Sequence, residues 1–244
     1  MIRRALFSRS TREAEDAFAW RGEGVSRLEN LSDIVFAFAI SFLVAGSDLP
    51  RTFDELAETM VDFVAVGMCF ALLLFVWYTH YLFFRRYGLE DGRTVVLNGV
   101  LLFVILLYVY PLRFLTGFQV DLFSGRLSGA EIGSVVSYGQ APWLMLIYSA
   151  GYGAVFALFA LLYQHALSRA DALGLNETER VMTRQRVAFG WVHMGVALAS
   201  VVISFLVPAP LSPLGGMAYF AIWPLLMLVG RPYKRRLAEM RHES

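Results

Sequence analysis

Six long apolar segments, separated by polar ones, constrain the fold of this chain more than any other feature of its sequence. A helix that crosses the hydrocarbon layer of a membrane needs about 20 mostly apolar residues. Windows close to this length occur at residues 31–46, 61–84, 95–114, 142–167, 187–207 and 214–229. Only 17% of the residues are charged, against about 25% in soluble domains. The sequence therefore predicts an all-α, polytopic membrane protein with six transmembrane helices.

The distribution of basic residues predicts the orientation of these helices. Of the 21 Lys and Arg residues, all but Arg51, Arg113 and Arg126 lie before the first window, after the last, or in the second and fourth connections. Cytoplasmic segments of membrane proteins carry the excess of Lys and Arg. We therefore expect both termini in the cytoplasm, with a tail at 1–30, a six-helix transmembrane domain at 31–230 and a second tail at 231–244.

Charge and cysteine content exclude several classes of protein. A formal net charge of +1 argues against a nucleic-acid partner, which normally demands a strong basic excess. The single cysteine, Cys69, excludes a multi-cysteine zinc or iron–sulfur site. No phosphate-binding glycine loop, nucleophile elbow or His-Glu-x-x-His helix is present. We expect no enzyme, no metal site and no cofactor.

The first apolar segment is unusually short. Its uninterrupted apolar run, from Ile34 to Gly46, would extend only about 20 Å as a helix. The hydrocarbon layer is about 30 Å thick, so the helix is expected to begin earlier and to include Arg27–Asp33 as its opening turns. Those polar residues must then be buried in protein or face water.

One stripe of this helix carries Ile34, Phe38, Ser41 and Ala45 at helical spacing. In one interpretation the stripe lines a narrow ion pathway, with Phe38 as its constriction and Ser41 supplying a hydroxyl to the ion. Hydrophobic constrictions can gate a pore by losing their water. In the other interpretation the helix is tightly packed, and its small residues let neighbouring helices approach closely.

Four polar residues in three segments lie at the same expected membrane depth: Arg27, Asp33, His80 and Asn98. Ionisable groups in a membrane cost several kcal/mol unless they are paired or hydrated, which favours a single hydrogen-bonded cluster between helices. His80 lies one turn after Trp77, and a buried histidine is more often a neutral hydrogen-bonding group than a proton carrier.

Local signals also predict two helix boundaries. Asn176 precedes two acidic residues, a pattern typical of a helix N-terminus, so the fifth helix is expected to begin before it enters the membrane. Pro111 is expected to mark the end of the third helix, followed by a long external connection at 115–140.

The sequence Arg27-x-x-x-Leu31-Ser32-Asp33 resembles the Arg-x-x-x-Phe-Ser-Asp signature of the transmembrane protein 175 potassium channels. The resemblance continues through the second and third segments, which carry the pattern of the bacterial members: Trp77-x-x-His80, Phe84-Arg85-Arg86, Leu97-Asn98 and Pro111.

This resemblance implies a homotetramer in which four first helices surround the pore. The hydrophobic constriction would fall on Phe38, the hydroxyl layer on Ser41 and a further apolar layer on Ala45. A network that braces the pore helix would comprise Arg27, Ser32, Asp33, Trp77, His80 and Asn98. Phe38 stands where the family usually has isoleucine or leucine, so four rings would seal the axis more tightly. Ala45 replaces a larger aliphatic residue and would widen the outer layer.

The resulting hypothesis is a passive, potassium-preferring cation channel in a bacterial inner membrane, with the lipid bilayer and copies of itself as partners and potassium as the permeant ion. Two alternatives remain open. The chain could be a non-conducting scaffold of the same fold, or a proton-coupled transporter that uses Asp33 and His80.

Overall fold

The computed structural model describes residues 18–22, 24–44, 50–126, 135–137 and 139–242. Regular structure in these ranges is helical throughout. The long elements are α2 (Arg27–Val44), α3 (Phe53–Tyr87), α4 (Gly92–Phe123), α6 (Ala141–Ser168), α7 (Glu177–Leu206), the 3₁₀ helix η2 (Ala209–Ala221) and α8 (Ile222–His242). The prediction of an all-α fold is confirmed.

Within the described residues, five stretches are long and apolar enough to cross a membrane: α3, α4, α6, α7 and the combined stretch Leu211–Met240 of η2 and α8. Helix α2 is not among these stretches, because its 18 residues include three charged ones, Arg27, Glu29 and Asp33. It is also about 27 Å long at 1.5 Å per residue. The prediction that Arg27–Asp33 form its opening turns is confirmed.

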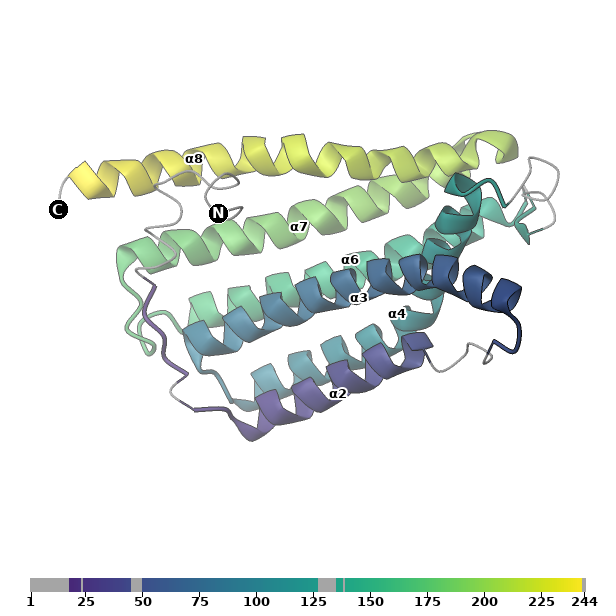
Figure 1. The fold of residues 1–244 in the computed structure, drawn as a ribbon. Helices are drawn as coiled ribbons and strands as arrows, with labels where there is room; N and C mark the ends of the chain where they lie inside the picture. The colour runs from purple at the N-terminus through teal and green to yellow at the C-terminus, as the bar shows by residue number, and fades with distance from the viewer. Residues whose placement is uncertain (1–17, 23, 45–49, 127–134, 138, 243–244) are drawn as a thin grey trace.

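The helices lie side by side along one common direction, with α2 at one edge of the bundle and α8 at the other (Figure 1). Helix α2 packs on α3 and α4, α6 packs on α4 and α7, and α8 packs on α7. One end of the bundle holds the α3–α4 turn (88–91), the α6–α7 turn (169–176) and the last part of α8 (231–242). We call this the arginine-rich end.

Capping side chains explain several helix boundaries. Thr52 and Asp91 accept hydrogen bonds from backbone amides in the first turns of α3 and α4. Gly88 ends α3 in the left-handed conformation, with φ at 57°. Asn176 and Glu179 form a reciprocal capping box at the start of α7. The predicted start of the fifth membrane helix is therefore confirmed.

The prediction that Pro111 ends the third helix is wrong, because Pro111 lies inside α4, which continues to Phe123. The turns beyond it bury Leu112, Thr116 and Val120 against the rest of the bundle. That packing favours continuing the helix, and membrane helices tolerate proline where neighbouring groups satisfy the freed backbone. The predicted connection at 115–140 correspondingly begins later than expected.

Candidate ion pathway

Helix α2 has one buried face, which fixes its rotation against the bundle. Its buried residues recur at alternating intervals of three and four: Glu29, Ser32, Phe36, Ala39 and Leu43. This spacing places them on a single stripe, which packs against α3 and α4. The opposite face of α2 must therefore point away from its own subunit.

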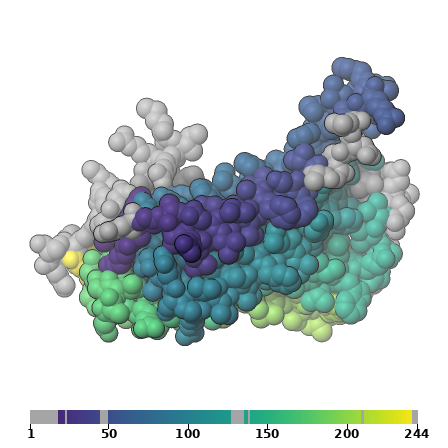
Figure 2. Space-filling model, turned by 90° about the horizontal axis from the view of Figure 1, so that it is seen from below, coloured from purple at the N-terminus to yellow at the C-terminus, as the bar shows by residue number. Residues whose placement is uncertain are grey.

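The exposed face of α2 carries the predicted pathway residues. Ile34 is 66% exposed and Phe38 is 55% exposed, and Ser41 is also exposed. Seen from the α2 edge, the helix lies on the surface of the subunit over α3 and α4 (Figure 2). Ala45 lies outside the described residues. Since the stripe is exposed within the subunit, the alternative of close packing by neighbouring helices would require helices of other subunits.

The two central residues of the stripe are held by local contacts. The Phe38 ring meets the Phe42 ring edge-on, with 4.4 Å between centroids, and Phe42 in turn lies 5.7 Å from the ring of Tyr110 on α4. The Ser41 hydroxyl donates a 2.9 Å hydrogen bond to the Ala37 carbonyl oxygen. Its proton is thereby directed into the helix, and its oxygen lone pairs stay available to a cation outside.

Behind the stripe, a chain of buried hydrogen bonds joins three helices. His80 Nε2 lies 2.8 Å from Asn98 Oδ1, and Asn98 Nδ2 donates to Ser32 Oγ at 3.0 Å. The Ser32 hydroxyl donates to the Leu28 carbonyl oxygen at 2.8 Å. Since the Asn98 amide group is committed to Ser32, its oxygen must accept, and His80 Nε2 must carry a proton. The three hydrogen bonds therefore run in one direction, from His80 through Asn98 and Ser32 to the Leu28 carbonyl oxygen.

A second link between α2 and α3 lies at the surface. Trp77 Nε1 donates a 2.8 Å hydrogen bond to Asp33 Oδ1, and the Trp77 ring stacks on Tyr81 with centroids 5.8 Å apart. Arg27 is exposed at the first position of α2. Among the described residues it makes no side-chain hydrogen bond or ion pair. The structure thus brings five of the six predicted network residues into two separate links and leaves Arg27 outside both.

The segment before α2 makes contacts that local sequence patterns do not reveal. Arg21 forms a 2.6 Å ion pair with the buried carboxylate of Glu179 on α7 and donates to the Leu173 carbonyl oxygen at 2.7 Å. The Arg21 amide also donates to the Arg85 carbonyl oxygen at the end of α3. Phe18 is buried and meets Tyr87 edge-on. The sequence signal was the pair of aromatic residues Phe18 and Trp20 in a stretch rich in charged residues.

Asp91 links the start of α4 to α6. It accepts from the Thr94 hydroxyl at 2.7 Å, and its other oxygen lies 2.7 Å from Nε2 of buried His165. Partial burial raises the pKa of the Asp91 carboxyl, but the hydrogen bonds from Thr94 and His165 outweigh burial and lower the pKa to about 2. Asp91 is therefore ionised across the physiological range.

Within the described residues, no group of three or more His, Cys, Asp or Glu side chains is arranged to hold a metal ion. The oxygen of Ser41 and the aromatic face of Phe38 are the groups that the exposed stripe offers to a cation. Such groups suit brief contact with a passing ion rather than stable coordination.

Comparison with known proteins identifies the family. The family model described as the endosomal/lysosomal potassium channel TMEM175 matches residues 27–108, which include α2, α3 and half of α4. A protein of Marivirga tractuosa named potassium channel is 36% identical over 221 residues, covering 88% of this chain and 90% of that protein.

A solved structure agrees with both matches. The crystal structure of a variant of the potassium channel MtTMEM175, bound to a nanobody–MBP fusion protein, superposes with a TM-score of 0.81 at 35% identity. The match covers 90% of this chain and 97% of that one. The chain therefore belongs to the TMEM175 potassium channel family.

Proposed function

We propose that this chain is one subunit of a passive, potassium-preferring cation channel whose pathway is lined by the exposed face of α2. The observation that carries the proposal is the contrast between the two faces of this helix. One face is buried against α3 and α4, while Ile34, Phe38 and Ser41 on the other face are exposed. The potassium channels that resemble this chain support the choice of ion.

A closed ring of four subunits would supply the cover that one subunit lacks. A single row of side chains on α2 cannot enclose a pore, whereas a cyclic homotetramer brings four identical rows around one axis. Helix α2 is short and carries three charged residues, so a position at the centre of an assembly suits it better than contact with lipid. Arg27, exposed and without a partner among the described residues, is then available to a neighbouring subunit.

Ions would pass a narrow apolar neck formed by four Phe38 rings. Such a neck holds water poorly and closes when it dries, so small changes in its diameter control conduction. One turn beyond it, four Ser41 hydroxyl oxygens replace part of the hydration shell of the ion. The small side chain of Ala45 would make the outer apolar layer of the pathway wider than the neck at Phe38. The hydrogen-bonded links behind α2 hold the four stripes in register.

The distribution of basic residues supports one orientation of the chain in the membrane. The arginine-rich end is assigned to the cytoplasm by its excess of basic residues. In this orientation both termini lie on the cytoplasmic side of a bacterial inner membrane, which the chain crosses several times. The permeant ion is the only ligand that the mechanism requires, and no cofactor takes part.

Potassium flux from proteoliposomes tests the proposal. Phe38→Ala opens the neck and is expected to raise the flux about tenfold or more, whereas Phe38→Trp fills it and is expected to lower it. Phe220→Ala is the matched control, because Phe220 is also exposed but lies on η2, which packs on α6, α7 and α8. It should leave the flux unchanged.

Two results would contradict the channel. If wild type and both Phe38 variants release no more potassium than empty vesicles, the chain is a scaffold. If release follows an imposed pH gradient rather than the potassium gradient, the chain is a proton-coupled transporter. Reversal potentials in potassium, sodium and proton gradients separate these outcomes.

A further inference from the structure

Helix α8 carries a groove on the face that points away from the bundle. The groove, of about 450 Å³, is lined by Leu228, Arg231, Pro232, Arg235, Arg236 and Glu239. These positions recur at helical spacing and form one face. The opposite face of α8 is buried at Gly230 and Leu237, and a Cβ at Gly230 would lie 3.3 Å from the Phe189 ring of α7. The groove is therefore held in a fixed orientation.

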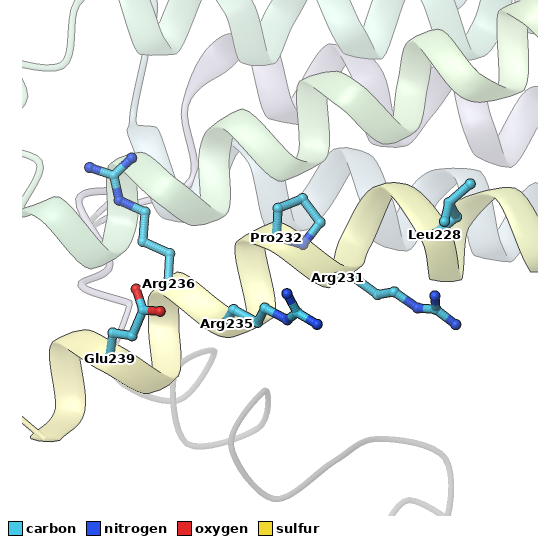
Figure 3. A pocket seen from close by; sticks show the side chains of 6 residues that line it. All are labelled: Leu228, Arg231, Pro232, Arg235, Arg236 and Glu239. Atoms are coloured by element: carbon cyan, nitrogen blue, oxygen red, sulfur yellow. The ribbon is translucent and has the colours of Figure 1, made fainter.

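The groove has a basic part and an apolar part. Arg231 and Arg235 extend in the same direction along the helix, toward Leu228 (Figure 3). Arg231, Arg235 and Arg236 are all exposed, and none of them makes an ion pair with another described residue. Pro232 cannot donate the backbone hydrogen bond that the Leu228 carbonyl oxygen would normally accept, and its ring adds an apolar wall.

The apolar part continues along α8 as a stripe with no cover. Trp223 is 65% exposed, and Met227 and Leu228 on the following turn are also exposed. Only 11% of the most apolar window of this span is buried within the subunit, the smallest share among the five spans. Lipid acyl chains are the natural neighbours of such a surface, and its basic end lies where α8 leaves the apolar layer.

We infer that this groove binds an anionic phospholipid, with the phosphate held by Arg231 and Arg235 and the acyl chains lying along Leu228, Met227 and Trp223. Charge complementarity selects the headgroup, because guanidinium groups pair with phosphate through parallel hydrogen bonds. Clusters of Lys and Arg next to a membrane helix also attract anionic lipid. The site lies at the edge of the bundle opposite α2 and does not depend on conduction.

Lipid binding to the purified, detergent-solubilised full chain tests this inference. Native mass spectrometry would be used to titrate dioctanoyl phosphatidylglycerol, dioctanoyl phosphatidylcholine and inorganic phosphate. Wild type should bind the phosphatidylglycerol at least about tenfold more tightly than either of the other two. The double variant Arg231→Gln/Arg235→Gln should lose at least about tenfold of that affinity.

The matched control is Arg184→Gln/Lys234→Gln. It removes the same charge from exposed positions at the same end of the bundle, outside the groove, and should change the affinity less than about threefold. Equal loss in both double variants would show diffuse attraction and overturn the site. Tight binding of inorganic phosphate, or equal binding of phosphatidylcholine, would overturn the anionic lipid as ligand. These two arms use wild type alone, so the inference stays falsifiable even if a variant fails to fold.

Discussion

The two halves of α2 are held in different ways. The amino-terminal half is held by directional polar contacts, which are the reciprocal bonds between Ser26 and Glu29, the chain through Ser32, and the link from Asp33 to Trp77. The carboxyl-terminal half is held mainly by packing of buried residues such as Leu43. Hydrogen bonds fix a rotation, while apolar packing is less directional.

This difference divides the tasks of the helix. The polar half sets which face of α2 turns away from the subunit. The packed half carries Phe38 and Ser41 on its exposed face. We therefore expect substitutions in the polar links to act mainly on stability and assembly, and substitutions on the exposed stripe to act mainly on conduction.

The largest effect on stability is expected from Asn98→Leu. This change leaves Ser32 and His80 buried without their partner, at a cost of about 2–4 kcal/mol in the free energy of unfolding. Thermal unfolding in detergent measures it. The triple variant Ser32→Ala/His80→Leu/Asn98→Leu removes all three polar groups and should recover part of the loss. If Asn98→Leu is as stable as wild type, the hydrogen bonds through Ser32, Asn98 and His80 do not hold α2.

Acid should weaken the start of α4, the helix that supplies Asn98. Because the folded-state pKa of Asp91 is lowered to about 2, its ionised form stabilises the fold above about pH 4, and this contribution disappears as the pH falls toward 2. Solvent screening reduces it to about 1 kcal/mol. Asp91→Asn keeps a helix cap but should be less stable than wild type at pH 6.

Unfolding temperatures of both proteins between pH 6 and pH 2.5 check this prediction. The difference between wild type and Asp91→Asn isolates Asp91 from other carboxylates, and it should shrink below about pH 4. A difference that stays constant over this range would show that Asp91 acts as a cap alone.

A smaller effect is expected from Trp77→Phe, which removes the exposed hydrogen bond to Asp33. The expected loss is about 0.5–1 kcal/mol in the free energy of unfolding, measured by chemical denaturation in detergent. Trp143→Phe is the control for ring size, since Trp143 contacts Phe205 through its ring and is more exposed than the half-buried Trp77. Equal losses in the two variants would assign the effect to ring size rather than to the hydrogen bond.

The smallest effect on stability is expected from Ser41→Ala, at less than about 0.5 kcal/mol, because the hydroxyl is exposed and bonds only its own helix. Potassium flux should nevertheless fall several-fold, since the hydroxyl layer is lost. Ser41→Thr keeps the hydroxyl and should keep most of the flux. Loss of stability without loss of flux would reverse the division of tasks between the two halves of α2.

Sequence patterns predicted the features that depend on neighbouring residues. Arg27–Asp33 lead into an apolar run too short for a membrane, so they had to be helical, and Asn176 had the spacing of a helix cap. Pro111 misled because a proline signal acts locally, whereas the packing of Leu112 and Thr116 that keeps α4 helical depends on other helices.

For the polar contacts behind α2, the sequence likewise predicted one part and missed another. The free-energy cost of a polar side chain in the membrane predicted that Asn98 and His80 would need hydrogen-bond partners. It could not predict that Ser32, Asn98 and His80 form one chain while Asp33 and Trp77 form another, because the rotation of each helix decides this. Arg21 and Glu179 carried no signal for pairing, since neither residue is unusual in its own segment.

The ion pair between Arg21 and Glu179 joins positions 158 residues apart, and this separation limits the order of events during biosynthesis. A ribosome completes Arg21 long before it reaches Glu179, so this ion pair cannot form until more than half of the polypeptide has been made after Arg21. The segment ahead of α2 can thus reach α3 early, but it gains its ion pair to α7 only after most of the bundle has been made.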